Sequence, residues 1–109
     1  MARILLLSPD EPSARDLALF LEKKSHRVSV HCERRAFIDS PKQDLSSVDI
    51  VILDMSANRP DDWNALDCVC KWAGTIDSKL MTLCLSRVYR GPKFELDVER
   101  RGARLVYVR

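Results

Sequence analysis

Glycine and long apolar runs are scarce in this sequence, and each scarcity excludes a class of protein. Three glycines occur in 109 residues, and no glycine-rich phosphate loop is present, so the pattern does not indicate a nucleotide-binding enzyme. The longest apolar runs, residues 4–7 and 50–53, have the length of a strand and are far too short to cross a bilayer. The first run follows the initial methionine almost directly, so we expect a cytoplasmic protein with no signal peptide and no membrane anchor.

An excess of either charge is also missing, and the reactive side chains show no catalytic pattern. The formal net charge is +2, from 18 basic and 16 acidic residues. The sequence therefore shows no basic patch of the kind that binds nucleic acid. We expect the four cysteines to be reduced, structural thiols, because no secretory signal accompanies them. Cys68 and Cys70 would point roughly 200° apart on a helix, so they could not share a metal without a second pair. His26 and His31 flank a short predicted strand, and the order of residues along the chain does not suggest a Ser/His/Asp or Cys/His catalytic group. We therefore expect no enzymatic activity.

The order of the predicted elements indicates one α/β domain over residues 1–109. Apolar residues make up 46% of the chain and charged residues 31%, which is the balance of a globular domain. Continuous or alternating apolar runs predict strands over 3–8, 27–31, 49–54, 80–86 and 105–108, and helical periodicity predicts helices over 13–24, about 60–73 and 94–101. A short helix could also form within 34–40. Strands that alternate with helices favour a parallel sheet with helices on both faces.

Several polar residues follow the predicted strands, and the carboxyl ends of parallel strands meet at one edge of a sheet. Asp10 and Glu11 follow the first strand, Asp54 closes the third, Ser86 closes the fourth, and Arg109 follows the fifth. Grouped carboxylates suit a hard cation such as Mg²⁺. A hydroxyl and a cation beside them could hold a phosphoryl group on one carboxylate.

Two segments carry a resemblance to a known family. Residues 5–12 (Leu-Leu-Leu-Ser-Pro-Asp-Glu-Pro) and 48–55 (Val-Asp-Ile-Val-Ile-Leu-Asp-Met) resemble the first strand and the phosphoacceptor strand of response-regulator receiver domains, and 102–103 (Gly-Ala) before the last strand also fits. The resemblance covers essentially the whole chain. It implies a flavodoxin-like fold with a five-stranded parallel sheet in the order 2-1-3-4-5.

The resemblance also implies a function and roles for the residues at the sheet edge. Asp54 would accept a phosphoryl group from a histidine kinase, and Mg²⁺ would be held by Asp54 and Asp10, with Glu11 compensating for a missing acid. Ser86 would follow the phosphate, and Arg109 would stand where the family has a lysine. The partners would be a histidine kinase or another signalling protein.

The chain also departs from the family pattern. Pro9 stands where the family has the first of two acids, and Arg109 replaces the lysine. At the switch position of the last strand Val106 falls in register, while the aromatic Tyr107 comes one residue later. No residues remain for the family's last helix, so we expect one sheet face near the first and fifth strands to be under-covered and to favour a homodimer or a partner helix.

Three functions stay open at this stage. The first is a phosphoacceptor domain of a two-component phosphorelay, which requires a Mg²⁺ site. The second is a phosphorylation-independent, receiver-like module for protein interaction or dimerisation, favoured by Pro9, Arg109 and the missing helix. The third, an enzyme acting on a small molecule, ranks last because no general base, cofactor motif or lid is present.

Overall fold

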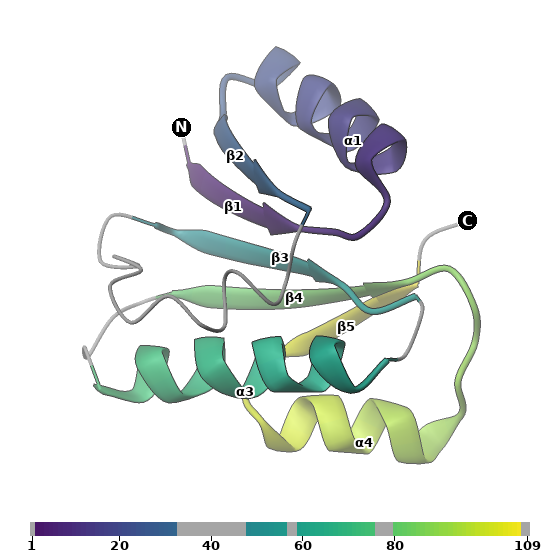
Figure 1. Cartoon of the computed structure of the whole chain (residues 1–109). Coiled ribbons are helices and arrows are strands. Elements are labelled where there is room, and N and C mark those ends of the chain that lie inside the picture. Colours follow the sequence, from purple (N-terminus) through teal and green to yellow (C-terminus); the bar gives the residue numbers. More distant parts are fainter. Residues whose placement is uncertain (1, 33–47, 57–58, 76–79, 108–109) are drawn as a thin grey trace.

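Figure 1 shows the computed structural model of the chain, which describes residues 2–32, 48–56, 59–75 and 80–107. Within these residues the strands are β1 (Arg3–Leu7), β2 (Arg27–His31), β3 (Ile50–Asp54), β4 (Met81–Ser86) and β5 (Arg104–Tyr107). The helices are α1 (Glu11–Lys23), α3 (Pro60–Thr75) and α4 (Pro92–Arg100). The short helix expected within 34–40 lies outside the described residues. No described helix is long and apolar enough to cross a membrane.

All five strands form one parallel sheet in the order β2-β1-β3-β4-β5. This confirms the strand order and the flavodoxin-like class expected from the sequence. The central strand β3 pairs with β1 on one side and with β4 on the other, so that Leu53 lies opposite Leu7 and Asp54 lies opposite Leu85. The carboxyl ends of β1, β3 and β4 therefore meet at one edge of the sheet.

Local signals explain where the helices begin and end. Asp10 is the N-cap of α1, and Pro12 stands in the first turn, where the missing N–H of proline is harmless. Helix α4 follows Gly91, whose φ of 90° favours glycine, and has Pro92 as its first residue. After α4 the chain turns at Gly102, with φ of 89°. Both helices begin two residues earlier than the apolar periodicity predicted.

The two faces of the sheet are covered unequally (Figure 1). Helices α3 and α4 cover one face and bury the larger core, which includes Leu7, Val51 and Leu53. Helix α1 lies on the opposite face, over a smaller cluster of Ile4, Leu6, Ala14 and Ile52. Central strands that are buried on both faces require continuous apolar runs, which is why residues 4–7 and 50–53 do not alternate.

Beyond α1, part of that second face has no helix over it in the described structure. Alternate residues of β4 and β5 point there, among them the exposed Arg104, which pairs with Leu83. We call the four apolar ones the open sheet face: Met81, Leu83, Leu85 and Val106. Met81 is 45% exposed and Val106 is 41% exposed, while the two leucines are half-buried. In the part of the chain that the structure describes, the open sheet face lies over β4 and β5, whereas α1 lies over the β1 side of the same face.

Candidate functional site

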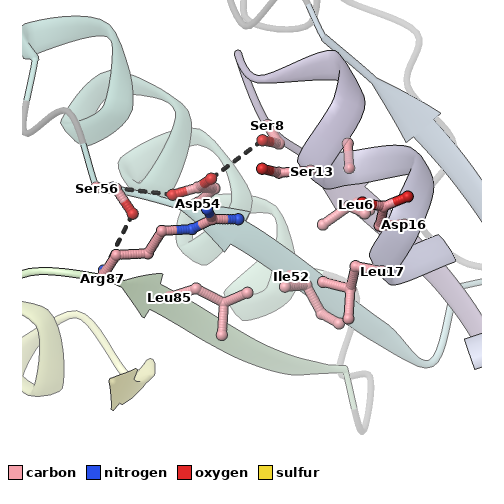
Figure 2. A pocket seen from close by; sticks show the side chains of 11 residues that line it. Leu6, Ser8, Ser13, Asp16, Leu17, Ile52, Asp54, Ser56, Leu85 and Arg87 are labelled. Atoms are coloured by element: carbon pink, nitrogen blue, oxygen red, sulfur yellow. Dashed lines mark hydrogen bonds between the residues drawn. The ribbon is translucent and has the colours of Figure 1, made fainter. Parts of the chain in front are cut away.

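The site is organised around Asp54, the last residue of the central strand β3. Its side chain is buried, with a relative exposure of 8%. One carboxylate oxygen, Oδ2, accepts a hydrogen bond from the Ser8 hydroxyl at 3.1 Å, and the other, Oδ1, accepts one from the backbone N–H of Ser56 at 2.9 Å (Figure 2). A buried carboxylate needs such donors because it has left water. These two hydrogen bonds therefore fix the orientation of the Asp54 carboxylate at the edge of the sheet.

Ser8 is a site residue that the sequence analysis did not identify. It follows β1 directly, is 2% exposed, and its hydroxyl oxygen also accepts the backbone N–H of Asp10 at 3.3 Å. The available signal was a serine placed between an apolar strand and Pro9. Ser8 thus supplies the donor at the place where β1 passes beside the end of β3.

Asp10 and Glu11 have partners within helix α1. Asp10 is exposed; its Oδ1 accepts the backbone N–H of Ser13 at 3.3 Å, and its Oδ2 accepts the Ser13 hydroxyl at 3.0 Å. Glu11 is exposed and forms an ion pair with Arg15, one helical turn further on, at 2.6 Å. The side chains of both acids therefore contact residues in the first turns of α1, and none of these contacts joins them to Asp54.

This arrangement bears on the Mg²⁺ expected from the resemblance. A protein Mg²⁺ site requires oxygen ligands turned toward one cation in near-octahedral geometry. Within the described ranges, no group of three or more His, Cys, Asp or Glu side chains could hold a metal ion. As placed, Asp10, Glu11 and Asp54 do not fit a shared Mg²⁺ centre.

Ser86 lies at the same edge of the sheet but is engaged in its own loop. It is fully buried, its hydroxyl donates to the Val88 carbonyl at 2.7 Å, and its oxygen accepts the Val88 N–H at 3.3 Å. These two bonds close the turn after β4. Arg109, the remaining expected site residue, lies outside the described residues.

Ser56 joins the loop after β3 to the loop after β4. Its hydroxyl accepts the backbone N–H of Arg87 at 3.1 Å, and its carbonyl accepts a hydrogen bond from the Arg90 guanidinium. In Figure 2 the Arg87 side chain points along the site toward Asp54. Arg87 and Arg90 belong to a basic loop whose charge is visible in the sequence, but its approach to Asp54 depends on the contact with Ser56.

A cavity of about 470 Å³ lies beside Asp54, between α1 and the strand ends. Its apolar lining comes from α1 and from three strands: Leu17, Leu6, Ile52 and Leu85. Its polar lining includes Asp54, Arg87 and three serines: Ser8, Ser13 and Ser56. The carboxylate, the guanidinium and an aliphatic floor are therefore brought to one cavity by segments far apart in the sequence (Figure 2).

Solved structures similar to this chain carry the same fold. A structure described as a pilus assembly protein (CpaE) from Burkholderia thailandensis matches 98% of this chain and 85% of its own, with a TM-score of 0.79 and 22% identity. A pilus assembly-related protein from Burkholderia pseudomallei matches 98% and 78%, with a TM-score of 0.78 and 23% identity. The receiver domain of a Francisella response regulator, numbered 1452, matches 98% and 84%, with a TM-score of 0.76 and 12% identity.

These comparisons define the class of fold. The chain has the fold of a response-regulator receiver domain, as the resemblance in its sequence predicted. No family model and no curated protein sequence matches it.

Proposed function

We propose that this chain is a cytoplasmic, receiver-fold signalling module that acts through protein contacts and does not need a phosphoryl group on Asp54. The observation that carries the proposal is the separation of the acids. Asp54 is bound by Ser8 and Ser56, whereas Asp10 and Glu11 are bound within α1. A phosphoacceptor site needs cation charge beside the developing phosphoryl group, and the acids as placed do not gather to hold that cation.

The open sheet face supports the interaction part of the proposal. Its four aliphatic side chains adjoin one another on neighbouring strands, and two of them are more than 40% exposed. Contiguous apolar surface of this kind marks a protein contact in many domains. The first partner to test is a second copy of the chain, and a histidine kinase or another signalling protein is the alternative.

The test is the association state of the purified chain over a concentration series, measured by sedimentation velocity. We expect a dimer that is lost in the double variant Met81→Asp/Val106→Asp. Leu96→Asp is the matched control, because Leu96 on α4 is as exposed as Met81, at 45% for each, but lies outside the open sheet face. A chain that stays monomeric, or a dimer that Leu96→Asp disrupts equally, would count against self-association through this face.

Phosphorylation of Asp54 is a second candidate, favoured by two observations. Asp54 closes the central strand at the carboxyl edge of the sheet, and it lines an open cavity into which Arg87 directs a cation. Such an edge is where sites form in open parallel sheets. In this candidate Asp54 would be the nucleophile and the phosphoryl group would lie in that cavity.

Acetyl phosphate or beryllofluoride, each with Mg²⁺, distinguishes the two candidates. Intact mass and tryptophan fluorescence are followed in the wild-type chain and in Asp54→Asn. We expect no saturable, Mg²⁺-dependent change in the wild type. A change that is saturable and absent from Asp54→Asn would establish the phosphoacceptor function and overturn the first proposal.

A further inference from the structure

The cavity beside Asp54 has the size and lining of a small-molecule site. Its volume of about 470 Å³ falls within the roughly 300–1,000 Å³ that is usual for ligand pockets. Leu6 and Ile52 form its floor from adjacent strands, while Leu17 of α1 and Leu85 of β4 flank them. This apolar part would accept a branched aliphatic or aromatic group.

At the polar end, two of the three serine hydroxyls already use their hydrogens, and the Ser56 hydroxyl accepts the Arg87 N–H. The Ser8 hydroxyl donates to Asp54, and the Ser13 hydroxyl donates to Asp10. What these groups still offer a ligand is lone pairs, and the Asp54 carboxylate has about four lone-pair sites, of which its two hydrogen bonds use only part. Asp16 adds a second, exposed carboxylate to the lining. This end of the cavity therefore matches a cationic donor such as an ammonium group.

Arg87 provides the opposite charge on the same cavity. Its backbone is fixed by the hydrogen bond to Ser56, and its side chain points into the site (Figure 2). Within the described part of the chain, the Arg87 guanidinium takes part in no hydrogen bond or ion pair. A free guanidinium presents a planar fork of donors that matches a carboxylate.

A carboxylate, a guanidinium and an aliphatic floor in one cavity match a ligand with three complementary parts. We propose that this cavity binds a free α-amino acid with an apolar side chain. The ligand's ammonium contacts Asp54, its carboxylate contacts Arg87, and its side chain packs on Leu6, Ile52 and Leu85. The proposal goes beyond the protein-contact function, and the two share Leu85, which belongs both to the cavity lining and to the open sheet face.

The test is isothermal titration of the full chain with L-leucine and with two analogues that each lack one charge. Isoamylamine keeps the ammonium and the branched chain but lacks the carboxylate, and 4-methylpentanoate keeps the carboxylate but lacks the ammonium. We expect saturable binding of leucine, with each analogue weaker by at least about tenfold, since a site built for a charged group rejects a ligand lacking it. L-Glutamate should bind more weakly than leucine, because its side chain would place a charge on the apolar floor.

Variants assign each charge to its partner. Arg87→Gln should remove the preference for leucine over isoamylamine, and Asp54→Asn should remove the preference for leucine over 4-methylpentanoate. Arg104→Gln is the control for the first variant, because Arg104 is an exposed arginine at the start of β5, outside the cavity lining. Circular dichroism verifies that each variant is folded.

The proposal is overturned if no apolar amino acid binds the folded wild-type chain, or if isoamylamine binds as tightly as leucine. It is also overturned if Arg104→Gln weakens leucine binding as much as Arg87→Gln. Sedimentation of the same samples tests the protein-contact function separately, so a failure of one proposal is not read as a failure of the other.

Discussion

Replacing Ser8 with alanine tests the central feature of the site, the hydrogen bond that holds Asp54. The Ser8 hydroxyl donates to the Asp54 carboxylate at 3.1 Å, and the two side chains are 2% and 8% exposed. The variant therefore leaves a buried carboxylate with its Ser56 bond and one bond fewer.

The structure sets the expected size of the effect. Hydrogen bonds to charged groups contribute about 1.5–3 kcal/mol, so we expect Ser8→Ala to lower the free energy of unfolding by about 1.5–3 kcal/mol. The hydroxyl is small, so the void that it leaves adds little. Ser13→Ala is the matched control: its hydroxyl bonds to the exposed carboxylate of Asp10, and we expect a loss below about 1 kcal/mol.

The assay is urea unfolding of the single variants and of Asp54→Ala, with and without Ser8→Ala, analysed as a double-mutant cycle. Because Asp54→Ala removes the acceptor, Ser8→Ala should then cost at least about 1 kcal/mol less than in the wild type. Equal losses for Ser8→Ala and Ser13→Ala, or a coupling energy near zero, would refute the view that Ser8 holds Asp54.

The remaining predictions concern the frame around the site. Gly91→Ala should lower the free energy of unfolding by about 1–3 kcal/mol and Gly102→Ala by about 1 kcal/mol. An added Cβ would meet nothing within 4 Å at either position, so the loss comes from backbone strain at positive φ. Urea unfolding measures both variants, and unchanged stability would contradict the strain. Burial raises the pKa of the Cys84 thiol to about 12, so iodoacetamide at pH 8 should label Cys84 in the unfolded chain and leave it unlabelled in the native one, as peptide mass mapping would show. The same shift predicts that the free energy of unfolding contributed by Cys84 is fully present below the ordinary thiol pKa of 9.0 and is lost as the pH rises toward 12. Urea unfolding at pH 8 and at pH 10.5 measures this loss in the wild type, with Cys84→Ala as the reference that lacks the thiol. Arg101→Lys should cost about 1 kcal/mol, since lysine cannot reproduce the bonds to Asp67 and the Asp97 carbonyl together, and a stability equal to wild type would count against those contacts.

Much of the fold followed from local patterns in the sequence. Residues 4–7 and 50–53 are continuous apolar runs, a pattern typical of short strands buried on both faces. The alternation of these strands with helical periodicity then led to the parallel sheet. Helix starts were less accurate, because Asp10, Gly91 and Pro92 set them through backbone geometry rather than through apolar spacing.

The position of the site was also predictable, while its partners were not. Asp54 and Ser86 lie at the carboxyl edge because parallel strands end together. Asp10, by contrast, follows β1 as expected but turns to the first N–H groups of α1. An aspartate at that place can either cap a helix or face the strand ends, and sequence spacing is the same for both.

By itself, the sequence determined the class of fold and the place of Asp54 at the end of the central strand. These depend on periodicity and chain order, which local side-chain preferences dictate. Only the tertiary structure decided that Ser8 and Ser56 hold Asp54, that Arg87 shares its cavity, and that the open sheet face lies over β4 and β5. Those contacts join segments distant in the chain, and their geometry exists only after the sheet and helices have packed.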